Sequence, residues 1–131
     1  MVDDPVLGAL VPDADGGCWT ASLALKGATV RFTVGGYGAP DPQLVSRARE
    51  ISRGFGEFQT RVRSYLEGSA RAQVERRALA PEIASLQIET IMFAWPDRPQ
   101  HGMVFFTGAS EGREWHCDMI GEDLRDLACD T

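Results

Sequence analysis

The chain has 131 residues, of which 44% are hydrophobic, and its 13 basic and 19 acidic residues give a formal net charge of −6. A chain of this length and composition is expected to form one domain, residues 1–131, with a core of its own. The negative charge repels nucleic-acid phosphates and anionic membrane surfaces, which argues against partners of either class.

The first part of the chain predicts strands. Residues 6–11 form a short apolar run, and residues 12–17 are rich in Asp and Gly, as is typical of a turn. Two alternating segments follow, residues 19–25 and residues 29–34, and such alternation is typical of half-buried strands. Because only Lys26-Gly27 separates them, we expect these two strands to form a β-hairpin.

The middle of the chain predicts a long amphipathic helix. Asp41 followed by Pro42 is a favourable helix start, with an N-cap side chain and proline at the first helical position. Seven apolar residues then recur at steps of three or four, which keeps one face of a helix apolar. This stripe consists of Leu44, Ala48, Ile51, Phe55, Phe58, Val62 and Leu66.

Two glycines, Gly54 and Gly56, interrupt the helical segment, and each costs about 1 kcal/mol relative to alanine inside a helix. They permit a kink or a break into two helices. Because the apolar stripe keeps its phase across them, we expect a nearly continuous helix to about Leu66. A further helical piece is expected over residues 69–79, ended by Pro81.

The last part of the chain again predicts strands, over residues 86–95, 103–107 and 113–120, and the short connection 108–112 predicts a hairpin between the last two. Strands at both ends and helices between them predict an α+β fold. We expect an antiparallel sheet built from N-terminal and C-terminal strands, with one face covered by the central helical block.

The residues that carry chemistry show no constellation typical of a metal or cofactor site. Cys18, Cys117 and Cys129 are too widely spaced for a zinc knuckle, and their odd number does not suit a disulfide framework. On the strand 113–120, alternation predicts Trp115, Cys117 and Met119 facing inward and His116 and Asp118 facing outward. The glycine-rich residues 35–38 lack the Lys-Ser or Lys-Thr of a phosphate loop. We therefore predict no metal and no cofactor.

The location and assembly of the protein are also expectations from the sequence. Residues 1–5 lack the basic segment and apolar core of a secretory signal, and no stretch approaches the length of a membrane span. A cytoplasmic location is the default. An exposed edge strand would allow two copies to pair, so a monomer and a homodimer both stay open.

The order of features resembles a family of small bacterial proteins of unknown function. The resemblance rests on residues 7–10 (Leu-Gly-Ala-Leu), Trp19, the Lys26-Gly27 connection, the helix start at Asp41-Pro42 and the closing residues 118–121. Some members of that family resemble immunity proteins of bacterial toxin systems, which implies a binding role without catalysis. The resemblance implies no catalytic residues.

The charge distribution favours a binding function with a basic protein partner. Residues 41–80 carry eight arginines and five carboxylates, a local charge of +3 that leaves −9 for the remainder. We expect the working surface to be either the uncovered sheet face or the acidic C-terminal part. An acidic surface of this kind suits a partner such as a nuclease-like toxin, although solubility alone also explains it. The candidate partner-binding residues are Glu111, Glu114, Asp118, Glu122, Asp123 and Asp126, with Asp130 beyond them.

The alternative is a small enzyme with a pocket between sheet and helices. His116 or His101 would act as general base there, with Asp118 or Glu114 as its neighbour. A deep pocket in which the two histidines converge with a carboxylate would favour the enzyme. A flat acidic surface with dispersed histidines would favour binding.

Overall fold

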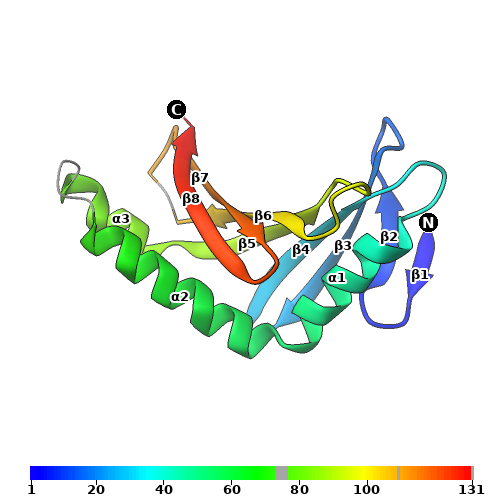
Figure 1. The fold of residues 1–131 in the computed structure, drawn as a ribbon, viewed down its shortest axis with the longest axis horizontal. Helices are drawn as coiled ribbons and strands as arrows, with labels where there is room; N and C mark the ends of the chain where they lie inside the picture. The colour runs from blue at the N-terminus through cyan, green and yellow to red at the C-terminus, as the bar shows by residue number, and fades with distance from the viewer. Residues whose placement is uncertain (73–76, 109, 131) are drawn as a thin grey trace.

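The computed structural model describes residues 1–72, 77–108 and 110–130. It contains eight strands, three α-helices and one 3₁₀ turn (Figure 1). The strands are β1 Val2–Asp4, β2 Gly8–Pro12, β3 Cys18–Leu25, β4 Ala28–Gly35, β5 Gln87–Phe93, β6 His101–Thr107, β7 Glu114–Ile120 and β8 Asp123–Asp130. The helices are α1 Pro42–Arg53, α2 Phe55–Arg71 and α3 Ala80–Ser85, the last preceded by the 3₁₀ turn Arg77–Leu79.

The eight strands form one open sheet in which each strand neighbours the next one in sequence. Strands from the two ends of the chain therefore share a sheet, as the sequence predicts. All neighbours are antiparallel except β4 and β5, which run parallel with Phe32 opposite Ile91. The prediction of a fully antiparallel sheet is wrong at this junction. The long helical connection makes the parallel pair feasible, because parallel strands need a crossover connection whereas antiparallel ones can be joined by a tight turn.

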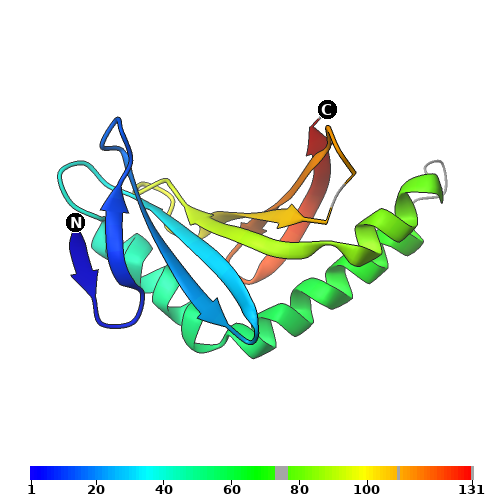
Figure 2. The same cartoon turned by 180° about the vertical axis from the view of Figure 1, so that it is seen from behind.

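The helices cover only one face of this sheet (Figures 1 and 2). All seven residues of the apolar stripe are buried, which confirms the predicted helical face. They pack in the same core as the inward residues of β4, namely Val30, Phe32 and Val34, all fully buried. The opposite face of the sheet is concave and carries no helix (Figure 2).

The helical block is broken at Gly54, so the expectation of a nearly continuous helix is wrong. Gly54 has φ −103° and ψ 30°, and its N–H donates to the carbonyl of Glu50 at 3.1 Å while its own carbonyl accepts from Phe58 at 3.0 Å. One backbone hydrogen bond thus joins Gly54 to the end of α1, and one joins it to the start of α2. Figure 1 shows α1 and α2 meeting at an angle and following the curved sheet, which lets both keep their apolar faces against it.

Pro81 begins a helix and does not end one. It lies in the first turn of α3, where its missing N–H has no helical partner in any case. The prediction of a helical piece over residues 69–79 ended by Pro81 is therefore wrong in its end, since α2 continues to Arg71 and the 3₁₀ turn starts at Arg77. Residues 73–76 of that piece lie outside the described residues.

The predicted strand segments correspond to β3 to β7, and the hairpin of β3 and β4 is confirmed with Leu25 opposite Ala28. Lys26 and Gly27 between them both have positive φ, 50° and 81°, as a two-residue hairpin turn requires. The sequence analysis missed β8. This strand is bulged at Asp126, which has φ 59°, so its apolar residues do not alternate regularly.

Hydrogen bonds and ion pairs of three arginine side chains connect the helices to the strands and their turns. Glu82 of α3, only 9% exposed, accepts from Arg113 at 2.9 and 2.8 Å and from the Trp115 indole N–H at 2.6 Å. The buried Arg47 of α1 donates to the carbonyl of Gly121 at 2.8 Å, after β7. Arg49 binds the buried carboxylate of Asp4 on β1. Each contact joins segments far apart in sequence, which fixes how the layers meet.

Replacing Glu82 by Gln should make stability depend on pH in a defined way. Hydrogen bonds from Arg113 and Ser110 outweigh burial and hold the pKa of Glu82 well below its usual range. The stabilisation is therefore present above pH about 5 and is lost as pH falls through and below the unfolded-state pKa of about 4.3. We expect Glu82→Gln to lower the free energy of unfolding by about 2 kcal/mol at pH 7. Urea unfolding at several pH values measures it.

The difference between Glu82→Gln and wild type should shrink steadily below pH 5. Glu57→Gln is the matched control, because Glu57 is exposed on α2 and has no ion pair with the described residues. A difference that is equal at pH 3 and pH 7 would show that the charge of Glu82 does not act as described.

The apolar stripe should dominate stability. Phe58 is 1% exposed and packs between α2 and the sheet, so Phe58→Ala is expected to cost about 3–5 kcal/mol through lost burial and a residual cavity. Glu57→Ala, one residue earlier on the solvent side, should change the free energy of unfolding by less than about 0.5 kcal/mol. Equal effects of the two substitutions in urea unfolding would contradict the packing described.

Candidate functional site

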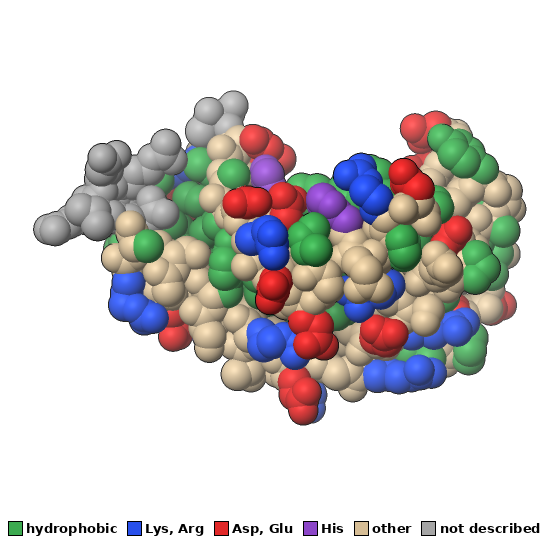
Figure 3. Space-filling model, in the orientation of Figure 1, with side chains coloured by type: hydrophobic (Ala, Val, Ile, Leu, Met, Phe, Trp, Pro, Cys, Tyr) green, Lys and Arg blue, Asp and Glu red, His purple; other side chains and the backbone are tan. Residues whose placement is uncertain are grey.

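The candidate site is the sheet face opposite the helices, called here the open face. Its side chains are those that alternate with the buried ones on β3 to β8. They include Thr20, Ser22, Arg31, Thr33, Thr90, Met92, His101, Met103, Phe105, Thr107, Glu114, His116, Asp118, Ile120, Arg125 and Asp130. Figure 3 shows the hollowed upper edge of the molecule on this side, where both histidines and several carboxylates gather.

The floor of the open face is apolar. Met92, Met103 and Phe105 lie on the neighbouring strands β5 and β6 and are half-buried although no helix covers them. On the β3–β4 side, the hydroxyls of Thr20 and Thr33 bond to each other at 3.1 Å. The surface therefore combines an apolar centre with polar groups whose hydrogen bonds are partly satisfied within the sheet.

Each histidine of the open face lies beside a carboxylate. His101 Nε2 is 3.7 Å from Asp118 Oδ1, and its ring meets the ring of Trp95 edge-on at 4.8 Å. His116 Nε2 is 3.3 Å from Asp130 Oδ2. The outward direction predicted for His116 and Asp118 is confirmed, because Cys117 between them is fully buried.

The structure does not bring His101 and His116 together. In the register of β6 and β7, His101 lies opposite Ile120 and His116 opposite Phe105. Four residues of strand separate the two positions, roughly 13 Å at about 3.3 Å per residue. Neither histidine lines any of four cavities of about 310–330 Å³ formed by the described residues. The pocket expected for an enzyme, with both histidines beside one carboxylate, is thus not formed by these residues.

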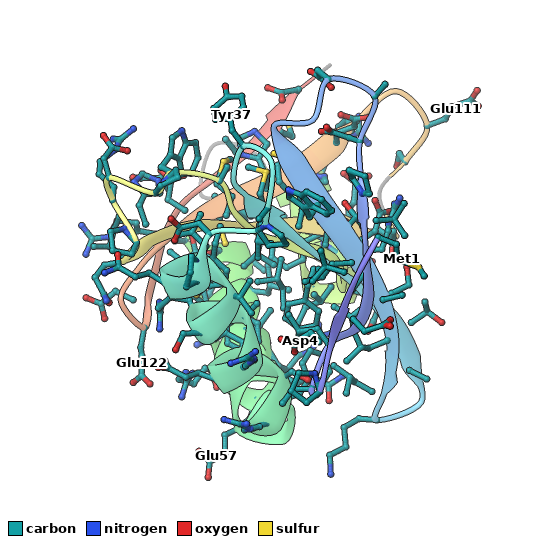
Figure 4. The ribbon with its side chains drawn as sticks, turned by 90° about the vertical axis from the view of Figure 1, so that its right-hand side faces the viewer. Met1, Asp4, Tyr37, Glu57, Glu111 and Glu122 are labelled. Carbon is teal, nitrogen blue, oxygen red and sulfur yellow. The ribbon has the colours of Figure 1, made fainter. Side chains whose placement is uncertain are left out.

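The predicted acidic set is split by the structure. Glu114 and Asp118 lie on the open face of β7, and Asp123 lies opposite Ile120, where it pairs with Arg125 at 3.4 Å. The others lie apart: Asp126 at the bulge of β8, and Glu111 and Glu122 far from each other on opposite sides of the view in Figure 4. Asp130, opposite Glu114, completes the carboxylates of the open face.

Charge is nevertheless divided between the two layers. Residues 41–85, which contain all the helices, carry eight arginines and six carboxylates. The remaining residues, which contain all eight described strands and none of the described helices, carry thirteen carboxylates and five basic residues. The formal charges are +2 and −8, so the strand-bearing part of the chain carries the negative charge of the protein.

The described residues form no metal-ligand cluster. They contain no group of three His, Cys, Asp or Glu placed to hold a metal ion. The glycine loop after β4 has a structural reason: a Cβ at Gly35 would lie 2.5 Å from the carbonyl oxygen of Ala94, and the Trp19 indole N–H donates to the carbonyl of Gly36 at 3.1 Å. Close packing of backbone explains these glycines without a ligand.

Comparisons with known proteins found no match. No model of a protein family, no curated protein and no solved structure matches the chain. Within the described residues, no helix has the length and apolar character needed to cross a bilayer. The resemblance to the bacterial family therefore stays a prediction, and function is argued from the geometry of the open face.

Sequence reasoning missed the apolar floor of this face, although the signal was present. Residues 101–107 alternate with Gly102, Val104 and Phe106 inward, which places His101, Met103 and Phe105 together on the other side. The strand predicted from the sequence begins at Met103, two residues late, and so leaves His101 out of this face. The parallel pairing of β4 with β5 that brings the Thr33 side next to Met92 also has no local signal.

The buried thiol of Cys117 should be inert in the folded protein. Burial, with a smaller contribution from Asp118, raises the pKa of Cys117 to about 12. At pH 8, an alkylating reagent should label Cys117 only as fast as the protein unfolds, whereas the half-exposed Cys129 should react sooner. Mass spectrometry of labelled peptides measures both rates. Fast labelling of Cys117 in the native protein would contradict the described core.

Proposed function

We propose that the chain is a non-catalytic protein-interaction domain whose open face receives a basic segment of a protein partner. One observation carries the proposal: a concave sheet face, free of helices, combines a half-buried apolar floor with carboxylates on β7 and β8. Apolar surface supplies affinity when a partner removes it from water. The carboxylates supply orientation and exclude acidic partners.

The layered charge supports a basic partner. The helical part of the chain is net positive and the rest is strongly negative, so a basic protein approaching the molecule is attracted to the strand-bearing part. On the open face, Asp118 lies beside His101 and opposite Arg125, and Asp130 lies beside His116. Neither carboxylate has an ion pair with an arginine or lysine of the described residues. These carboxylates remain available to cationic side chains of a partner.

An immunity-like role fits this surface. A nuclease-like toxin carries positive charge where it contacts nucleic acid, and an acidic concave face would compete for that same region. The resemblance to the bacterial family supports this class of partner, and with it a cytoplasmic site of action. The proposal requires no cofactor.

A small enzyme is the second candidate, favoured by the two His–carboxylate pairs. It is the weaker one because each histidine has a separate carboxylate and lines none of the four cavities described above. The enzyme would be favoured if His101→Gln or His116→Gln abolished the biological effect while partner capture stayed intact.

Neutralising the open face should remove partner capture. We expect the double variant Asp118→Asn, Asp130→Asn to lose at least tenfold in affinity for proteins captured from the native host, and the captured proteins to be basic. The capture should weaken as salt rises, because the attraction is electrostatic. Quantitative affinity capture with mass spectrometry measures both.

The matched control is Glu57→Gln, Glu67→Gln, which removes the same charge from exposed positions on α2. It should retain wild-type capture. An equal loss in both double variants would reduce the effect to net charge, and retention of capture by the open-face variant would contradict the proposed surface. Thermal unfolding of each variant confirms that it is folded.

A further inference from the structure

One end of the open face is hollowed into a cavity of about 310 Å³. It lies where β5, β6 and β7 approach the connection between β6 and β7. Its lining includes Glu89, Thr90, Phe105, Thr107, Arg113 and Glu114. The register places Thr90 directly opposite Phe105, with a bulge at Glu89 that turns this extra residue to the cavity wall.

Three charged side chains line this cavity, and two of them form ion pairs with other described residues. Arg113 donates its Nε and Nη2 to Glu82, so its charge is compensated on the helix side. Glu89 accepts from Arg31 at 3.1 Å. Glu114, by contrast, has no ion pair with any other described residue. The cavity therefore keeps one uncompensated negative charge at its wall.

The floor of the cavity is an aromatic ring. Phe105 lies on β6 between Thr90 of β5 and His116 of β7, and it is half-buried because nothing covers the open face. The hydroxyl-bearing side chains of Thr90 and Thr107 lie next to it on the same face. An aromatic face beside a carboxylate and two hydroxyls is a suitable environment for a flat cation.

We propose that this cavity binds an arginine side chain of the basic partner. The guanidinium would stack on Phe105, direct two N–H groups to the carboxylate of Glu114 and leave its remaining donors to the threonine hydroxyls. Lysine fits less well, since its ammonium is more strongly hydrated and cannot stack. This inference rests on the proposed function and names the anchor of the same surface.

Titration with a small probe tests the cavity without the partner. We expect N-acetyl-arginine methylamide to shift the amide resonances of residues 89–90, 105–108 and 114–115 in ¹⁵N NMR spectra. N-acetyl-lysine methylamide should bind at least threefold more weakly. Glu114→Gln and Phe105→Leu should each weaken the arginine probe about tenfold, whereas Glu122→Gln, in the turn after β7, should leave it unchanged.

Several outcomes would overturn the inference. Shifts spread over the surface, or equal losses in Glu114→Gln and Glu122→Gln, would show non-specific attraction. Equal binding of the lysine and arginine probes would show a cation site without preference for guanidinium. The spectra of Phe105→Leu report whether that variant is folded, and Glu114→Gln, at an exposed position, gives an independent answer.

The same variants separate this inference from the proposed function. If capture of the partner is lost in Asp118→Asn, Asp130→Asn but not in Glu114→Gln, the open face binds the partner and the arginine anchor is wrong. If the probe binds as expected but capture of the partner is unchanged in Asp118→Asn, Asp130→Asn, the cavity binds arginine and the proposed function is wrong.

Discussion

Burial of one helical stripe against one face of the sheet is the constraint on which the rest of the structure depends. Seven apolar residues between Leu44 and Leu66 fix which face of the sheet becomes core. Because side chains alternate along a strand, the choice of inward residues also fixes the outward ones. Val104 and Phe106 inside therefore imply Met103 and Phe105 outside, and the open face follows from the core.

The chain closes this arrangement by joining its two ends at a single parallel pair, β4 with β5. Four strands lie on each side of that junction, and the helices that connect them occupy one face only. The helical block bends at Gly54 along the curved sheet, and the other face of that sheet is concave (Figures 1 and 2). The helices therefore decide which face of the sheet is core. The proposed binding surface is the other face, which they leave uncovered.

The features that depend on interactions close in sequence could be predicted from the sequence. The apolar stripe, the Asp41 cap, the Lys26-Gly27 turn and the inward direction of Cys117 depend on periodicity or on turn chemistry, and the structure confirms them. The parallel junction and the bulged β8 depend on distant contacts, which leave no local signal. The break at Gly54 has a local signal in the glycines, but the unbroken phase of the apolar stripe favours a continuous helix. The arginine contacts to Asp4, Gly121 and Glu82 likewise join residues that sequence spacing cannot relate.

The separation of His101 from His116 shows the same limit, since only the register of β6 and β7 decides it.

The most direct test of the binding surface uses the methionines of the chain as reporters. Met92 and Met103 lie on the open face, Met1 is exposed at the chain end and Met119 is fully buried. In oxidative footprinting, a bound partner should protect Met92 and Met103 and leave Met1 and Met119 unchanged. Equal oxidation of Met92 and Met103 in the free and the bound protein would contradict the account.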